Sequence, residues 1–156
     1  RSVCLDVLNE TDLDVLLLAG RYSLMDHTAL ATLLPLCVRK QVRLALGGVF
    51  NSGILATGVR AGQPARFNYA EAPSDLRERV AALEEACEAM AVPLRAAALQ
   101  FPLAHPCIDL VLLGARSTSE WQDARAMLAQ PIPAKFWQHL RTRGLLPADA
   151  PLPEDA

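Results

Sequence analysis

Two short polar loops, each placed directly after an apolar segment, hold the residues of this chain best suited to chemistry. The first follows residues 44–46 and reads Gly47-Gly48-Val49-Phe50-Asn51-Ser52-Gly53. The second follows residues 110–113 and reads Gly114-Ala115-Arg116-Ser117-Thr118-Ser119-Glu120. A strand that ends in glycine and then serine or asparagine, ahead of a helix, offers backbone N–H groups to an anion. The sequence therefore predicts two anion-binding loops, which together could hold the two halves of a phosphorylated cofactor.

Arg116 is the strongest single candidate for contact with a phosphate. Its guanidinium is a rigid fork of donors that matches a phosphate group, and the hydroxyls of Ser117, Thr118 and Ser119 follow it directly. The alternative is an ordinary surface arginine at the start of a helix. The helix dipole disfavours a cation at that position, so the placement favours a bound anion.

The remaining reactive side chains are interpreted as structural. His27 and His139 are each expected to be solvated or to cap a helix. His105 is expected to be a structural residue of a loop. Trp121 and Trp137 stand at helical positions and are expected to pack in the core. The four cysteines are scattered, form no CxxC pair and stand in apolar segments: Cys4, Cys37, Cys87 and Cys107. This favours buried thiols in a reducing cytoplasm over disulfides, and no metal site is expected.

Parallel strands must position the two loops, because strand and helix patterns alternate along the chain. Strands are expected near residues 14–18, 42–47 and 108–113, and helices near 27–40, 75–90, 94–103, 119–129 and 134–143. Asp26 is the expected N-cap of the first helix, and Pro35 is expected to kink it. The stretch 47–74 has no clear periodicity and is expected to be a long loop. Three βα units in series imply a parallel sheet with helices on one side.

Composition excludes several other classes of protein. With 156 residues, 52% of them hydrophobic and 21% charged, the chain is expected to be a single globular domain. A net charge of −2 gives no reason to expect a nucleic-acid partner. No apolar run approaches the roughly 20 residues of a membrane span, and no signal peptide is evident. The chain opens on Arg1 without a methionine, so we expect a processed, tagged or truncated start.

Several separated motifs, in a consistent order, resemble one family. They are the segment 12–58, Asn68-Tyr69-Ala70, Leu99-Gln100-Phe101-Pro102-Leu103-Ala104-His105-Pro106 and Gly114-Ala115-Arg116-Ser117. In these motifs the chain resembles the C-terminal half of an aldo-keto reductase, over residues 7–146. The subgroup it most resembles is the sugar dehydrogenases that act on L-fucose, D-threo-aldoses or galactose. Leu17-Leu18-Ala19-Gly20-Arg21-Tyr22-Ser23-Leu24 and Phe50-Asn51-Ser52-Gly53 carry that likeness.

The resemblance implies an α/β fold, namely a partial (β/α)8 TIM barrel whose three strands correspond to the sixth, seventh and eighth. Residues 1–146 would form this part of the barrel, and residues 147–156 a flexible tail rich in proline and acids. The resemblance also implies a nicotinamide dinucleotide site. Asn51 and Ser52, with Gly53 in the same loop, would lie along the pyrophosphate. Arg116 and Ser117, which follow Gly114, would meet the adenosine 2′-phosphate, which favours NADP over NAD. Asp123 falls where the family often has an acid near the adenine.

The same resemblance limits the activity expected of this chain. The family uses Asp, Tyr, Lys and His of the early strands, with Tyr as general acid and base. Neither Tyr22 nor Tyr69 matches that tyrosine, so no catalytic residue is assigned and the isolated chain is expected to be inactive. The complete protein would transfer a hydride between NADP (or NAD) and a sugar or aldehyde.

The alternative is a truncated, non-catalytic half-barrel that acts as an oligomerising or weak nucleotide-binding module. In both cases the open sheet edges and apolar face predict a homodimer or association with the missing half.

Overall fold

The computed structural model describes residues 3–60, 66–67 and 70–154, and the elements below refer to these residues. They follow one another as α1 Val3–Glu10, β1 Val15–Ala19, α2 Leu33–Lys40, β2 Arg43–Gly47, α3 Ile54–Thr57, β3 Arg66–Phe67, β4 Ala70–Glu71, α4 Ser74–Ala89, α5 Leu94–Gln100, the 3₁₀ helix η1 Phe101–Ala104, β5 Ile108–Leu112, α6 Thr118–Ala129 and α7 Ala134–Thr142. The three expected strands and the helices expected near 75–90, 119–129 and 134–143 are confirmed with small shifts of their ends.

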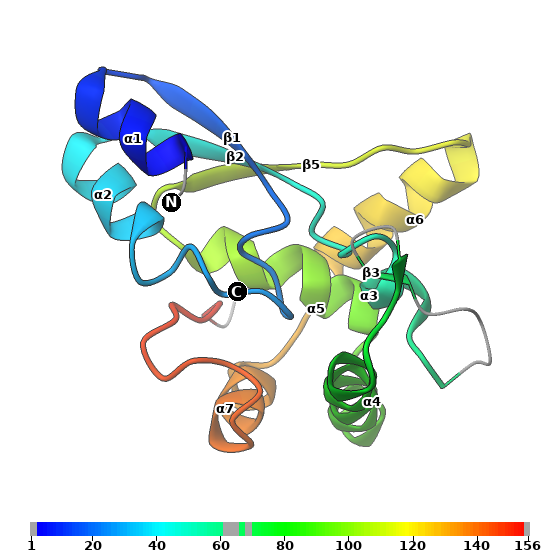
Figure 1. Cartoon of the computed structure of the whole chain (residues 1–156). Coiled ribbons are helices and arrows are strands. Elements are labelled where there is room, and N and C mark those ends of the chain that lie inside the picture. The colour runs from blue at the N-terminus through cyan, green and yellow to red at the C-terminus, as the bar shows by residue number, and fades with distance from the viewer. Residues whose placement is uncertain (1–2, 61–65, 68–69, 155–156) are drawn as a thin grey trace.

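Strands β1, β2 and β5 form one sheet with β2 in the centre (Figure 1). Both pairs of neighbours run parallel, with Leu16 opposite Leu44 and Gly47 opposite both Ala19 and Leu112. A parallel pair needs a crossover connection, and the helices between the strands supply it. The chain therefore has an α/β fold built on a small parallel sheet, as the alternating pattern predicts.

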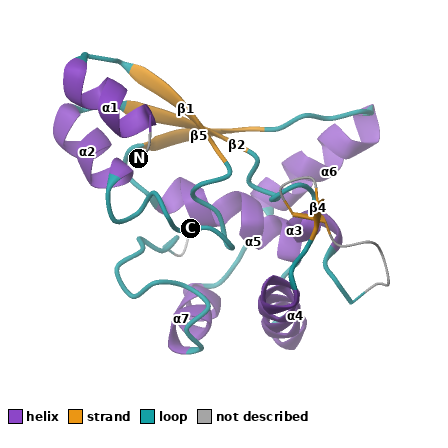
Figure 2. Ribbon diagram, viewed as in Figure 1, coloured by secondary structure: helices purple, strands orange, loops and turns teal. Residues whose placement is uncertain are grey.

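One face of this sheet is buried. Side chains alternate along each strand, and Leu18, Leu44 and Leu46 are among the most buried residues of the chain. The helices α4, α5 and α7 lie on one side of the sheet in the view of Figure 2. In α5, residues 96–98 are three consecutive buried alanines, and their small side chains let the helix approach its neighbours closely.

The opposite face of the sheet is open and apolar. Its side chains include Val15, Leu17, Leu110 and Leu112, each between 49% and 59% exposed. The described part of the chain places no element over them. We refer to these four residues as the open sheet face, since a sheet face this apolar is normally covered in a folded protein.

The helix expected over residues 27–40 is wrong in its first half. Residues 28–32 form turns, and the helix begins only at Leu33. Asp26 does not cap this helix; its Oδ1 accepts hydrogen bonds from the N–H (2.9 Å) and Oγ1 (2.6 Å) of Thr28. Pro35 falls in the first turn of α2, where a missing N–H costs nothing, so it allows the helix to start there instead of kinking it.

The stretch 47–74 is also more structured than expected. It contains the short helix α3 and the antiparallel pair of β3 and β4. Near its start, the carbonyl of Phe50 accepts from Gly53 and Leu55, and such local bonds leave no periodic hydrophobic signal. Helix α1, which packs against α2, was not anticipated. The spacing of Cys4, Leu5 and Leu8 could have revealed it.

Candidate functional site

The loops that follow the three strands meet at one edge of the sheet. Because β1, β2 and β5 are parallel and in register at Gly47, their carboxyl ends lie side by side. The N–H of Gly20 also donates to the carbonyl of Gly47 at 2.9 Å, which joins the first two loops at their base. We refer to residues 20–23, 48–53 and 113–117 together as the carboxyl edge. Both loops singled out in the sequence belong to it.

The loop after β2 has an unusual backbone. Asn51, Ser52 and Gly53 are consecutive residues with positive φ, at 47°, 60° and 96°. The N–H of Asn51 donates to the carbonyl of Gly48 at 2.9 Å, and that of Gly53 to the carbonyl of Phe50 at 3.0 Å. The expectation that this loop offers unpaired N–H groups is therefore wrong at Asn51 and Gly53, because the turn uses both donors itself.

The side chain of Asn51 is held by Ser23, a residue to which the sequence assigned no role in the site. Ser23 Oγ lies 2.6 Å from Asn51 Oδ1. Both residues are buried, whereas the neighbouring Ser52 is exposed. This bond links the loop after β1 to the loop after β2. A serine in a short loop gives no signal in the sequence, since its partner lies 28 residues away.

The loop after β5 is organised by a helix cap. Ser117 is the N-cap of α6, and its Oγ accepts the N–H of Glu120 at 3.2 Å. Glu120 in turn accepts the N–H of Arg116 at 2.7 Å, together with Nη2 at 2.7 Å and Nε at 3.1 Å of the same residue. The hydrogen bonds from Arg116 lower the pKa of Glu120, and the same side-chain hydrogen bond with Glu120 raises the pKa of Arg116.

This pairing weakens one argument for an anion at Arg116. Glu120 already supplies the negative charge that the helix start favours, so the position of Arg116 needs no bound anion to explain it. The Arg116 side chain nonetheless remains 92% exposed. It is therefore accessible at the carboxyl edge, and its partner Glu120 is itself 40% exposed.

Gly114 and Asp123 are the remaining site residues expected from the sequence. A Cβ added at Gly114 would meet no atom within 4 Å, so the space beside this glycine is open. Asp123 lies on α6, and its Oδ1 accepts a hydrogen bond from Arg95 Nη2 at 3.0 Å. The carboxylate of Asp123 is thus paired with a cation from α5.

Tyr22 is not available as an acid or base at the surface. Its hydroxyl is buried without a hydrogen-bond partner among the described residues, and burial, the largest cause, raises its pKa. Tyr69 lies outside the described residues. Near Tyr22, the buried His105 places Nδ1 3.2 Å from Cys107 Sγ, and burial raises the pKa of that thiol to about 11. His105 is structural, in accord with its interpretation from the sequence.

Two other interpretations from the sequence need correction. His27 is not solvated: Arg79 Nη2 lies 3.3 Å from its Nδ1, its ring packs on Phe101, and burial and Arg79 lower its pKa to about 4. Trp121 is 51% exposed and carries Arg125 over its ring at 4.9 Å, whereas Trp137 is buried as expected. An amphipathic spacing shows which residues share a face but not whether the fold covers that face.

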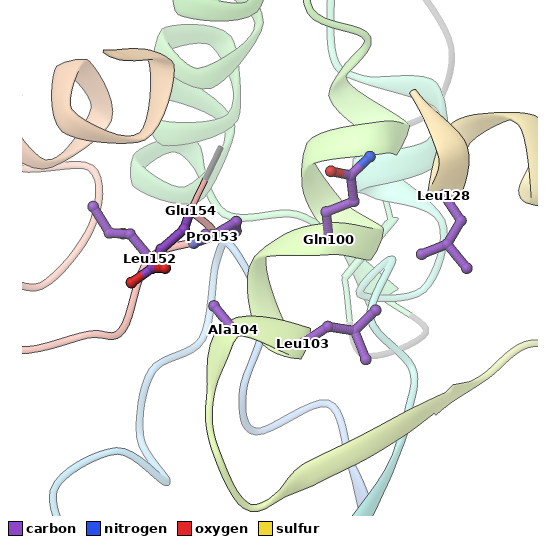
Figure 3. Close-up of a pocket in the computed structure, with 7 residues that line it drawn as sticks. All are labelled: Gln100, Leu103, Ala104, Leu128, Leu152, Pro153 and Glu154. Atoms are coloured by element: carbon purple, nitrogen blue, oxygen red, sulfur yellow. The ribbon is translucent and has the colours of Figure 1, made fainter. Parts of the chain in front are cut away.

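A groove of about 440 Å³ lies at the other end of β5. Gln100, Leu103, Ala104, Leu128, Leu152, Pro153 and Glu154 line it (Figure 3). Gln100 donates from Nε2 to the carbonyls of Met127 (2.9 Å) and Gln130 (2.8 Å), where it caps the end of α6. Since η1 precedes β5 in the chain, the groove faces the amino end of the strand and takes no part in the carboxyl edge.

The described residues set two further bounds. Among them, no three His, Cys, Asp or Glu side chains are arranged to hold a metal ion. Nor does any helix in the described ranges have the length and apolar character needed to cross a membrane. Cys37, Cys87 and Cys107 are buried and Cys4 is partly buried, and all four are free thiols.

Comparisons with known proteins find relatives along most of the chain. The model of the aldo/keto reductase family matches residues 3–142. Over 141 residues the chain is 44% identical to the pyridoxal 4-dehydrogenase of Microbacterium luteolum. This alignment covers 90% of this chain and 41% of that protein. It is 33% identical over 140 residues to the D-threo-aldose 1-dehydrogenase of a Pseudomonas species, covering 90% and 42%. The chain thus spans about two fifths of the length of these curated relatives.

Solved structures share the fold at lower identity. The aldo-keto reductase AKR11C1 from Bacillus halodurans aligns in its holo form with a TM-score of 0.66 and 23% identity. The apo form gives 0.63 and 22%. Each alignment covers 92% of this chain and less than half of the other, 46% and 47%.

Proposed function

The chain belongs to the aldo/keto reductase family, and from this premise we propose that it is the cofactor-binding C-terminal part of a nicotinamide-dependent oxidoreductase. The observation that carries the proposal is the meeting of two polar loops at the carboxyl ends of neighbouring parallel strands. In α/β proteins, ligands bind outside the carboxyl ends of the strands.

We assign the three strands to the sixth, seventh and eighth of a (β/α)8 barrel. Their parallel order and their helices on one face support this, as does the open sheet face, which a closed barrel would bury. Residues 1–146 would be the barrel part. The flexible tail of residues 147–156 stays a prediction, and its described part contacts the fold. Arg141 Nη2 donates to the carbonyl of the buried Ala150 at 2.6 Å, and Leu152, Pro153 and Glu154 line the groove of Figure 3.

The residues at the carboxyl edge fit a dinucleotide in chemical type. Asn51, Ser52 and Gly53 would hold the pyrophosphate, and the open space at Gly114 would admit an adenosine phosphate. The exposed Arg116 supplies a fork of donors, and Ser117 a hydroxyl next to it. Asp123 would lie near the adenine. Arg116 is the reason to favour NADP over NAD, since a guanidinium beside a 2′-phosphate gains a charge-assisted pair that NAD lacks.

When bound, the nicotinamide group supplies or accepts a hydride. The contribution of this chain is to bind and orient it, because none of its residues is proposed as the proton donor. Sugars and other aldehydes are the proposed substrates, by analogy with the aldose and pyridoxal named for the two relatives. In isolation the chain should be inactive, since general acid–base catalysis alone contributes about 10² to 10⁴ in rate.

A second candidate function is a non-catalytic half-barrel that oligomerises or binds nucleotides weakly. The open sheet face favours it, because such a face promotes association whether or not a reaction takes place.

The deciding experiment expresses the protein as its gene encodes it and, separately, the 156-residue chain. NADPH and NADH are titrated by fluorescence, and aldose oxidation is followed by the appearance of reduced cofactor. The proposal expects activity and tight binding for the gene product and no activity for the chain. Absence of dinucleotide binding by both would overturn it and leave the non-catalytic module.

A further inference from the structure

The hydrogen bond between Ser23 and Asn51 does more than join two loops. Ser23 is fully buried and Asn51 is 5% exposed, and the atoms Oγ and Oδ1 lie 2.6 Å apart. A bond this short between two buried polar groups holds both side chains in one orientation.

The protons of this bond can be assigned from the surroundings of Ser23. Its Oγ accepts the N–H of Met25 and the N–H of Asp26, each at 3.1 Å. A serine hydroxyl has one proton and two acceptor positions. Since both acceptor positions are taken, the proton must be donated to Asn51. This fixes the orientation of the amide, with Oδ1 toward Ser23 and both N–H groups of Nδ2 on the other side.

The backbone of Asn51 has little else to offer a ligand. Its N–H is used by the carbonyl of Gly48, and its φ of 47° turns the chain toward the exposed Ser52. Asparagine is among the few residues besides glycine that adopt this left-handed backbone readily. The donors that Asn51 can bring to the carboxyl edge are therefore those of its amide.

We propose that Ser23 is a positioning residue, which orients the Asn51 amide so that Nδ2 donates to the anionic pyrophosphate of the dinucleotide. This inference rests on the proposed function. An amide free to rotate would present its oxygen to a phosphate as readily as its nitrogen, and the oxygen would repel it. A lock on the productive orientation improves affinity without any added contact.

The first test replaces the donor and keeps the shape. Asn51→Asp retains an oxygen for Ser23 and tolerates a positive φ, but it replaces both N–H groups with an anionic oxygen. NADPH binding by the gene product should weaken about tenfold or more, as loss of a charge-assisted hydrogen bond implies. Unchanged affinity with a folded protein would overturn the inference and leave the proposed function intact.

The second test asks whether Ser23 acts through Asn51. Ser23→Ala should weaken NADPH binding, and Ser23→Thr, which keeps the hydroxyl, should restore it. Ser23→Ala is then made in an Asn51→Gly background, where the positive φ is retained and the amide is absent. There it should cause no further loss of affinity.

The outcomes separate the two hypotheses. An equal loss in both backgrounds would mean that Ser23 serves only the turn at residues 23–26, which overturns the inference. If the unmodified gene product binds no NADPH, the proposed function fails and the inference fails with it. Thermal unfolding of each variant checks that the proteins compared are folded, since Ser23→Ala also removes the acceptor for the N–H groups of Met25 and Asp26.

Discussion

At the scale of single residues, the carboxyl edge combines side chains of different accessibility. Asn51 is buried and held by Ser23, whereas Arg116 is exposed and paired with Glu120 in the first turn of α6. Exposed ion pairs of this kind contribute little to stability. Substitution of Arg116 should therefore affect ligand binding more than folding, which makes it a good probe of the site.

Arg116→Ala in the gene product is expected to weaken NADPH binding by about 10- to 150-fold while NADH binding changes little, because only NADPH would lose a charge-assisted pair with the guanidinium. Dinucleotide titration of both proteins measures this. Arg125→Ala is the control, because Arg125 lies on α6, the helix that follows Arg116, but stacks on Trp121. Equal losses of affinity for both cofactors would mean that Arg116 contacts the pyrophosphate. No loss for either cofactor would mean that Arg116 is an ordinary surface arginine.

His27 predicts a dependence of stability on pH. Burial, and then Arg79, lowers its pKa from 6.5 to about 4. Between these two pH values His27 is protonated in the unfolded chain and neutral in the folded chain. The stabilising contribution is therefore complete above pH 6.5 and is lost as the pH falls toward 4, on the order of 3 kcal/mol in all.

Urea unfolding of the chain at pH 7 and pH 4.5 tests this. His27→Gln keeps an acceptor for Arg79 but does not titrate, so the difference in unfolding free energy between the two pH values should shrink. His105, whose pKa burial also lowers, acts in the same direction and remains in both proteins. The same difference in both proteins would contradict the prediction.

At the scale of elements, the sequence predicted what hydrophobic periodicity can report. The strands near 14–18, 42–47 and 108–113 and the long helix near 75–90 carry strong patterns, and the structure confirms them. The start of α2 was wrong because residues 28–32 form local turns whose hydrogen bonds have no periodic signature. The Ser23–Asn51 bond was missed for a related reason, since contacts distant in sequence leave no pattern in either segment.

The segment that follows α3 is hydrogen-bonded to helix α4, and Gly58 lies at this contact. Glu84 Oε2 accepts the N–H of Val59 at 3.0 Å, and Arg60 pairs with Glu88 at 2.6 Å. A Cβ added at Gly58 would overlap the Glu84 carboxylate, and its φ of 74° already disfavours other residues. A side chain at position 58 would therefore displace the Glu84 carboxylate from its hydrogen bond with Val59.

Gly58→Ala should lower the free energy of unfolding by roughly 2–4 kcal/mol, because backbone strain of about 1–3 kcal/mol adds to a lost hydrogen bond. Gly144→Ala is the control: φ there is 70°, but no atom lies within 4 Å of the added Cβ. It should show the strain alone. Chemical unfolding of the three proteins gives the comparison, and equal losses for the two variants would mean that the contact with Glu84 contributes nothing.

At the scale of the whole molecule, the open sheet face is the feature that an independent domain would not leave uncovered. Val15, Leu17, Leu110 and Leu112 are about half exposed and lie on the two outer strands of the sheet, β1 and β5. Helix α6, which has no buried residue, adds the exposed Trp121 and Leu128 nearby in the chain. One covered and one open apolar face support the proposal that these strands form part of a barrel.

The isolated chain is therefore expected to self-associate through this face, as a dimer or larger species, at moderate concentration. Burial of apolar surface stabilises such contacts by about 25 cal/mol per Å², so a single polar substitution on the open sheet face should weaken them measurably. Leu17→Ser is the variant, because Leu17 is 56% exposed on β1. Val38→Ser is its control, since Val38 is 47% exposed but lies on helix α2, away from the open sheet face.

Light scattering across a concentration series should show association for the unmodified chain and for Val38→Ser, and a shift toward monomer for Leu17→Ser. If the unmodified chain stays monomeric throughout the series, the open sheet face is stable in contact with water. The proposal that the rest of a barrel covers this face would then lose its main support.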